Sequence, residues 1–80
     1  MSNKPEKFTI IVNTRKKTVD TETVSFEQIV ALAFNPVPPN TLFTVTYRGA
    51  AHHAEGALQP GGTVEIKNGT IFNVTDTGQS

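Results

Sequence analysis

Residues 25–34, SFEQIVALAF, constrain the fold most, because no other part of the chain has a helical pattern. Their apolar side chains recur at the i, i+3, i+4 and i+7 spacing of one helical face: Phe26, Ile29, Val30 and Ala33. Ser25 is placed to act as the N-cap, and Gln28 completes a capping box. Pro36, after Asn35, ends the helix. A helix of about three turns cannot bury its apolar face alone, so we expect it to pack on a sheet.

The rest of the chain favours strands, because β-branched and alternating apolar residues dominate it. The predicted strands cover residues 8–12, 18–24, 42–48, 63–67 and 70–75. Alternation assigns the following side chains to the face that packs on the helix: Phe8, Ile10, Val12, Phe43, Val45, Tyr47, Phe72 and Val74. Residues 13–17 are predicted to form a polar turn, and residues 49–56 a surface loop before the core residue Leu58. Asn68-Gly69 is a pair typical of a type I′ hairpin turn.

The order strand, strand, helix, strand, strand, strand is the layout of the β-grasp, or ubiquitin-like, fold of the α+β class, although other two-layer α+β folds share it. We therefore expect a mixed sheet of four to five strands packed on the helix at residues 25–34. In this fold the last strand is central and parallel to the first, so the strand before Asn68-Gly69 should be short or diverge. Residues 8–75 are assigned to the domain, residues 1–7 to a flexible N-terminal arm and residues 76–80 to a flexible C-terminal tail.

The composition argues against several classes of function. The 80 residues include no cysteine, which removes disulfides, thiolate catalysis and thiolate metal sites and is typical of a reducing compartment. Seven basic and seven acidic residues balance, so no strong electrostatic field favours nucleic acid or an anionic membrane. No apolar run approaches the ~18 residues that span a bilayer, and no signal peptide is visible. We expect a soluble cytoplasmic domain without a nucleic-acid or membrane partner.

No constellation of residues predicts catalysis, so we do not expect an enzyme, a cofactor or a metal site. His52-His53 with Glu55 suggest metal ligands, but adjacent histidines on extended chain point to opposite sides, and no further His or Cys completes a site. Residues 15–17, Arg-Lys-Lys, could contact phosphates. No aromatic residue interleaves with them and the net charge is zero, so we interpret them as a solvated turn.

Five segments in succession carry a family resemblance: FTIIVN, VSFEQIVALAF, NTLFTVTY, LQPGGTV and IFNVT. In this combination the chain resembles the bacterial multiubiquitin family, from about Phe8 to about Thr75. The resemblance implies a ubiquitin-like domain encoded beside E1-like and E2-like enzymes and a processing or deconjugating peptidase. Such bacterial ubiquitination-like operons are linked to anti-phage defence or protein modification. The chain would then be the modifier itself, in single-domain form, with these enzymes and target proteins as its partners.

The same resemblance implies that processing and conjugation occur in the C-terminal tail: Asp76, Thr77, Gly78, Gln79 and Ser80. Two alternatives remain open. A peptidase removes Gln79 and Ser80 to expose Gly78, or the terminus is used as it stands or after trimming elsewhere in the tail. The one Gly-Gly pair, Gly61-Gly62, precedes two predicted strands, so we interpret it as a turn and not as a cleavage site.

Alternation also predicts a partner-binding sheet face, on the side away from the helix. Ile11 and Ile71 should lie there on adjacent strands, with three polar neighbours: Thr44, Thr46 and Asn73. A small apolar spot on an open sheet face suits a partner site, although a few exposed isoleucines are normal on any sheet. The same face, or an edge strand, could support self-association.

The competing function is a non-conjugated β-grasp adaptor, a self-assembling interaction module or a relative of the sulfur carriers, because fold does not fix function. Sulfur carriers need a C-terminal Gly-Gly to form a thiocarboxylate, which this tail lacks. An adaptor would tolerate deletion of residues 76–80, whereas a modifier would not.

Overall fold

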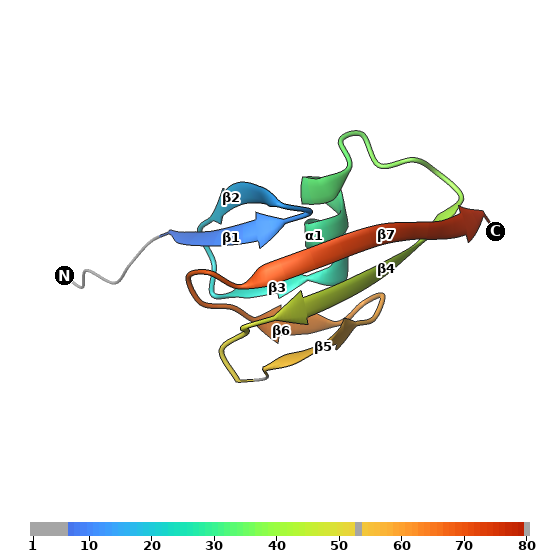
Figure 1. Ribbon diagram of the computed structural model, residues 1–80. Coiled ribbons are helices and arrows are strands. Elements are labelled where there is room, and N and C mark those ends of the chain that lie inside the picture. The colour runs from blue at the N-terminus through green and yellow to red at the C-terminus, as the bar shows by residue number, and fades with distance from the viewer. Residues whose placement is uncertain (1–6, 53, 80) are drawn as a thin grey trace.

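The computed structural model describes residues 7–52 and 54–79. The predicted N-terminal arm, apart from its last residue, therefore lies outside the described residues. The elements follow in this order (Figure 1): β1 (Phe8–Val12), β2 (Arg15–Val19), β3 (Thr23–Ser25), α1 (Phe26–Ala33), β4 (Thr41–Arg48), β5 (Glu55–Leu58), β6 (Thr63–Glu65) and β7 (Ile71–Gln79).

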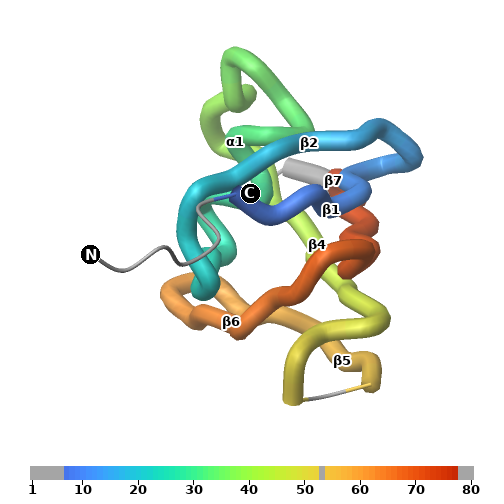
Figure 2. The backbone as a smooth tube through the Cα atoms, turned by 90° about the vertical axis from the view of Figure 1, so that its left-hand side faces the viewer, coloured from blue at the N-terminus to red at the C-terminus, as the bar shows by residue number. Residues whose placement is uncertain are grey.

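The strands form a mixed five-stranded sheet in the order β2-β1-β7-β4-β5 and a small second sheet of β3 and β6. β7 lies in the centre of the large sheet, parallel to β1 and antiparallel to β4. The helix α1 packs against β1, β4 and β7 (Figures 1 and 2). This arrangement confirms the predicted β-grasp fold, including the central last strand. The large sheet has five strands, within the predicted range, but β5 is one of them in place of the predicted strand 63–67, which forms β6 in the second sheet.

The helix begins and ends where the sequence predicts. The hydroxyl of Ser25 accepts a hydrogen bond from the backbone N–H of Gln28 at 3.1 Å, and the Gln28 side chain accepts one from the Ser25 N–H at 3.3 Å. The two bonds satisfy two of the helix's free N–H groups, as a capping box does. After Ala33 the backbone is already extended at Phe34, ahead of Asn35 and the cis-bonded Pro36.

The hydrophobic core lies between α1 and the five-stranded sheet. Its largest fully buried apolar side chains come from α1, β3 and the central strands: Phe72, Ile10, Ile29, Val12, Val24 and Val45. Thr70 is the one buried polar residue in the described part of the chain, and its hydroxyl lies 2.9 Å from the carbonyl oxygen of Gly49, to which it donates. Because this polar group is paired, its burial carries no large penalty.

The first hairpin is tighter than predicted. A two-residue turn at Asn13 and Thr14, with φ of 51° and 70°, brings Arg15 opposite Val12. Positive φ at both positions is the type I′ geometry, whose twist matches the flanking strands. Residues 15–17 therefore belong to β2, and the prediction that they form a solvated turn is wrong. The predicted strand 18–24 is correspondingly divided between β2 and β3.

The turn at Asn68-Gly69 does not close a hairpin, so that prediction is also wrong. β6 pairs with β3, whereas β7 pairs with β1 and β4. The turn instead bonds to β1: Thr9 donates its N–H to the Asn68 side-chain oxygen at 2.9 Å and accepts from the Gly69 N–H at 2.8 Å. These contacts direct the chain into the central position of the sheet, next to β1.

The predicted surface loop at residues 49–56 contains the start of an edge strand. β5 begins at Glu55 and pairs with β4, with Gly56 opposite Tyr47. Glycine is needed there, since a Cβ at this position would lie 2.7 Å from the Tyr47 hydroxyl oxygen. Leu58, at the end of β5, is buried as predicted.

The last strand extends further than the sequence predicts. β7 continues to Gln79, so residues 76–79 of the predicted tail belong to the strand, and Asp76, Gly78 and Gln79 pair with the first residues of β4. The strand forms here because pairing with β4 provides hydrogen-bond partners for the backbone N–H and C=O groups. Most of the side chains in this segment have little β-propensity of their own.

Candidate functional site

The structure brings together the five residues predicted for the partner-binding face. Ile11 of β1 lies opposite Ile71 of β7, and Asn73 and Thr75 of β7 lie opposite Thr46 and Thr44 of β4. The alternate residues on these strands are buried against α1, so this set lies on the other face of the sheet. We call this surface, defined by Ile11, Thr44, Thr46, Ile71 and Asn73, the open face.

The open face is polar apart from a small apolar centre. Ile71 is 38% exposed and Ile11 is half-buried, whereas the threonines and Asn73 are exposed. Leu42 of β4, 55% exposed, alternates with Thr44 and adds a separate apolar side chain opposite Gly78, near the C-terminal end of β7. Leu42 is not among the residues predicted for this face, although strand alternation places it two residues before Thr44 on the same side.

Charged side chains flank the isoleucine pair. One row of opposed residues crosses the whole sheet in the order Lys16, Ile11, Ile71, Arg48 and Glu55. The pair of isoleucines thus lies between two cations, with one carboxylate at the outer edge. An apolar centre between cations is complementary to a partner surface that has an aliphatic side chain beside carboxylates.

The C-terminal part of β7 is held more loosely than its beginning. Up to Val74, β7 has neighbours on both sides, because the Asn13 side chain extends the β1 side of the ladder. Its Nδ2 donates to the Val74 carbonyl at 3.0 Å, and its Oδ1 accepts from the Val74 N–H at 2.8 Å. Beyond Val74, among the described residues, only β4 pairs with β7.

A register shift further weakens this last segment. Asp76 lies opposite Phe43 and Gly78 opposite Leu42, so Thr77 has no partner residue in β4. Such a β-bulge interrupts the ladder locally. The Thr77 hydroxyl donates to the Leu42 carbonyl at 3.3 Å, which is a long hydrogen bond. The predicted conjugation segment is therefore an extended strand with one neighbour, and its last predicted residue, Ser80, lies outside the described residues.

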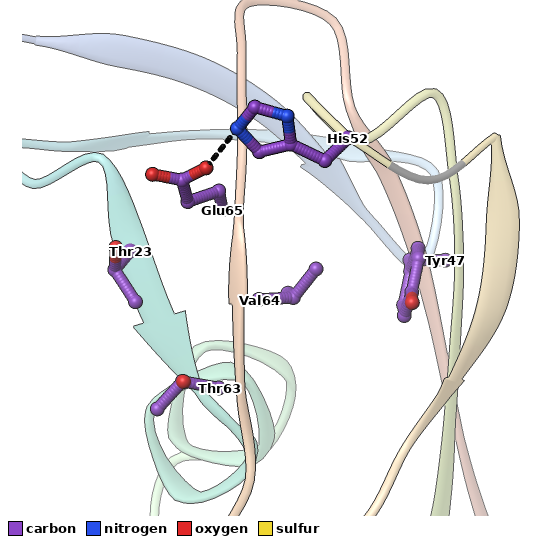
Figure 3. Close-up of a pocket in the computed structure, with 6 residues that line it drawn as sticks. All are labelled: Thr23, Tyr47, His52, Thr63, Val64 and Glu65. Atoms are coloured by element: carbon purple, nitrogen blue, oxygen red, sulfur yellow. Dashed lines mark ion pairs between the residues drawn. The ribbon is translucent and has the colours of Figure 1, made fainter.

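A small hollow lies between the two sheets, on the side of β6 (Figure 3). It measures about 330 Å³ and is lined by Thr23, Tyr47, Thr63 and Val64, together with an ion pair of His52 and Glu65. His52 therefore pairs with Glu65 and not with Glu55, the acidic residue near it in the sequence. Both side chains are largely exposed, so this pair contributes little to stability. His53 lies outside the described residues.

The described residues offer no metal site, because they contain no group of three or more His, Cys, Asp or Glu side chains that could surround an ion. They also contain no helix long and apolar enough to cross a membrane.

The mixed sheet with a central, parallel last strand, one capped helix and an exposed sheet face defines a ubiquitin-like domain. The sequence model of the multiubiquitin family matches residues 8–78, and the chain belongs to that family. The match extends through Gly78, so it includes the looser end of β7. Searches among curated proteins and among solved structures give no match.

Proposed function

We propose that this chain is a bacterial ubiquitin-like protein modifier, activated at its C-terminal segment and joined to target proteins in the cytoplasm. Membership of the multiubiquitin family supports this proposal. The observation that carries it is the pairing of residues 76–79, which extend past β1 and, among the described residues, pair only with β4 and in an interrupted register. Figure 1 shows the antiparallel strands β4 and β7 extending side by side past α1, to the end of the molecule where the C-terminus lies.

The chemistry required of such a modifier is activation of a carboxylate. An E1-like enzyme would transfer adenylate from ATP to the C-terminal carboxylate and release pyrophosphate. An enzyme nucleophile would then displace AMP and form an ester-type intermediate, from which an E2-like enzyme would transfer the modifier to its target. The domain itself supplies no catalytic group to these steps. It presents the carboxylate on an extended chain, and a peptidase would set the mature terminus, at Gly78 or elsewhere in residues 76–80.

Residues 76–79 must leave β4 to enter an enzyme active site. This release breaks the three pairings at Asp76, Gly78 and Gln79 and needs no change in the core. A backbone hydrogen bond contributes about 1 kcal/mol net, and these bonds lie at the solvent-exposed end of a strand, so we expect the segment to open without unfolding the domain.

The open face would supply the recognition surface for the enzymes of this pathway. Ile71 and Leu42 provide exposed apolar area, and Arg48 and Lys16 provide charge on either side of the isoleucine pair. The two isoleucines and the flanking cations are aligned in one row, which favours a partner over scattered surface isoleucines, whereas Leu42 lies at the other end of β4.

A second candidate function is a non-conjugated adaptor or a self-assembling module. The pairing of residues 76–79 with β4 favours it, because a segment that completes a sheet serves a structural role without any chemistry. In that case the open face would bind a partner, and the terminal carboxylate would remain unmodified.

Intact-mass analysis after mixing the protein with its cognate E1-like and E2-like enzymes, the peptidase and ATP separates the two functions. A modifier loses a short C-terminal piece or none, and then forms an ATP-dependent adduct on an enzyme. A variant without residues 76–80 should fold but form no adduct. Failure to form any adduct, with enzymes shown to be active on another modifier, would reject the modifier in favour of the adaptor.

A further inference from the structure

We infer that Asn13, in the turn between β1 and β2, is a positioning residue that fixes where β7 can open and so how far the C-terminal carboxylate can extend from the domain. This role rests on the proposed activation of that carboxylate and adds the point at which the released segment begins. Three features support it: the contacts of Asn13 with β7, the directions of the backbone groups around Thr75, and the interrupted pairing that follows.

Asn13 bonds to β7 at three points. Its backbone N–H donates to the Phe72 carbonyl at 3.0 Å, its Nδ2 donates to the Val74 carbonyl at 3.0 Å, and its Oδ1 accepts from the Val74 N–H at 2.8 Å. The pairing of β1 itself ends at Val12, opposite Phe72. The Asn13 side chain, which can donate and accept at once, therefore supports β7 two residues beyond the end of β1.

The Nδ2 contact completes the support of one particular peptide group. Because Val74 directs its N–H and C=O groups toward Asn13, its neighbour Thr75 directs its own groups toward β4, where it lies opposite Thr44. The Val74 carbonyl and the Thr75 N–H belong to the same planar peptide group. That group is thus held from both sides, by Asn13 on one side and by β4 on the other.

The strand is held less well after Thr75. By the same alternation Asp76 directs its backbone groups to the side where, among the described residues, no strand pairs with it. Thr77 then has no partner residue in β4. Burial of the Val74 side chain anchors the residue before Thr75, and Asn13 fixes the orientation of its carbonyl. Thr75 is therefore the pivot, the first residue at which β7 can bend away from β4 without breaking a contact of Asn13.

A pivot at Thr75 limits how far the terminus can extend. Residues 76–80 span at most about 18 Å when fully extended. If a peptidase exposes Gly78, three residues remain and the span falls to about 11 Å. An activating enzyme must bring its adenylation centre within this distance of the pivot. Moving the pivot by one residue would change the distance by about 3.5 Å, which is large compared with the tolerance of a reacting geometry.

Amide hydrogen exchange tests the pivot without any enzyme. Asn13→Gly should raise the exchange rate of Thr75 relative to that of Phe72 by at least about tenfold, because the peptide group of the Thr75 N–H loses one of its two contacts. The ratio corrects for a general loss of stability, so Ser25→Ala, which weakens the helix cap, should leave it unchanged. Asn40→Gly, the same substitution at a similar φ of 55°, should also leave it unchanged.

Asn13→Asp distinguishes the Nδ2 contact from the Oδ1 contact. Aspartate keeps an acceptor for the Val74 N–H but replaces the donor with an oxygen that faces the Val74 carbonyl. Exchange at Val74 should therefore stay slower than in Asn13→Gly, whereas the ratio of Thr75 to Phe72 should rise as it does with glycine. A ratio within about threefold of the wild-type value in both variants would overturn the proposal, because burial of the Val74 side chain alone would then set the pivot.

A shortened chain tests the consequence for activation by the cognate E1-like enzyme. Deleting residues 76 and 77 shortens the span by about 7 Å and leaves the terminal sequence unchanged. The deletion should lower ATP-dependent pyrophosphate release by at least about tenfold. Asn13→Gly should then raise the rate of the shortened chain at least about threefold, because Thr75 and Val74 can follow the tail out of the sheet.

Two results of this comparison have different meanings. If Asn13→Gly does not raise the rate of the shortened chain, a pivot set by Asn13 is contradicted. If the full-length wild type releases no pyrophosphate with enzyme that is active on another modifier, the proposed function is rejected, and the exchange ratio of Thr75 to Phe72 still decides the role of Asn13.

Discussion

Replacing Asn13 by glycine should destabilise the domain, because it removes the side chain that closes the ladder at Val74. The Asn13 amide makes two hydrogen bonds to the backbone of Val74, at 2.8 and 3.0 Å. A typical hydrogen bond contributes about 1 kcal/mol net, so the loss should amount to about 2 kcal/mol. The turn itself should survive, since Asn13 has a φ of 51°, which glycine adopts without steric cost.

Alanine at position 13 distinguishes the contribution of the backbone conformation to stability from that of the side-chain amide. It removes the same two hydrogen bonds, and unlike asparagine it has no polar side chain to offset the strain of a Cβ in the left-handed region, which costs about 1 kcal/mol more. We therefore expect a loss of about 3 kcal/mol for Asn13→Ala. The stability of a domain of this size is on the order of 5 kcal/mol, so both losses are readily measured. Asn13→Asp keeps the acceptor for the Val74 N–H and should lie between glycine and the wild type.

Urea unfolding followed by circular dichroism gives the free energies, and hydrogen exchange at the Val74 amide locates the effect. The melting temperature of Asn13→Gly should fall by about 8–16 °C. The explanation is wrong if the free energy of unfolding of Asn13→Gly lies within about 0.5 kcal/mol of the wild-type value and hydrogen exchange at Val74 is unchanged. Water would then replace the Asn13 amide as the partner of the Val74 backbone.

Three further substitutions test the helix cap, the core and the edge strand by the same urea assay. Ser25→Ala removes the acceptor for the Gln28 N–H and should lower the free energy of unfolding by about 1 kcal/mol; an unchanged value would show that the cap contributes nothing. Phe72→Ala leaves a cavity at a fully buried site and should lower it by about 3–5 kcal/mol, so that little of the protein stays folded; a well-folded variant would contradict the central position of this ring. Gly56→Ala places a Cβ 2.7 Å from the Tyr47 hydroxyl oxygen and should cost about 1–3 kcal/mol, while Ala57→Gly beside it tests the general sensitivity of β5.

The sequence predicts the helix and the faces of the strands well, because these depend on local patterns. The capping box at Ser25 and the proline after Asn35 fix the ends of α1, and a period of two places Ile11 and Ile71 on the open face. The adjacency of these two residues follows from the β-grasp topology and not from their separation in the sequence. The partner-binding role of the open face itself stays a prediction.

The features that the sequence did not predict depend on non-local pairing. Asn13-Thr14 lacks the glycine usual in a type I′ turn, so the start of β2 was placed three residues late. Asn68-Gly69 has the local chemistry of a hairpin, yet β7 pairs more extensively with β1 and β4 than it could with the three-residue β6. Residues 76–79 have little β-propensity and form a strand because β4 provides a partner.

A reversible cross-link between β4 and the end of β7 tests the central claim most directly. The described residues have no cysteine, and neither does the rest of the sequence, so a pair can be introduced at opposed positions as Leu42→Cys/Gly78→Cys. The control pair Thr44→Cys/Thr75→Cys locks β7 just before the segment that must be released. The assay measures ATP-dependent pyrophosphate release by the cognate E1-like enzyme. This adenylation step itself needs no reductant.

If residues 76–79 must leave β4 for activation, the oxidised 42–78 pair releases no pyrophosphate, recovers on reduction, and differs from the control pair, which is active in both states. Pyrophosphate release by the oxidised 42–78 pair at the rate of the control would contradict the account, because the carboxylate would then be activated while the strand remains in the sheet.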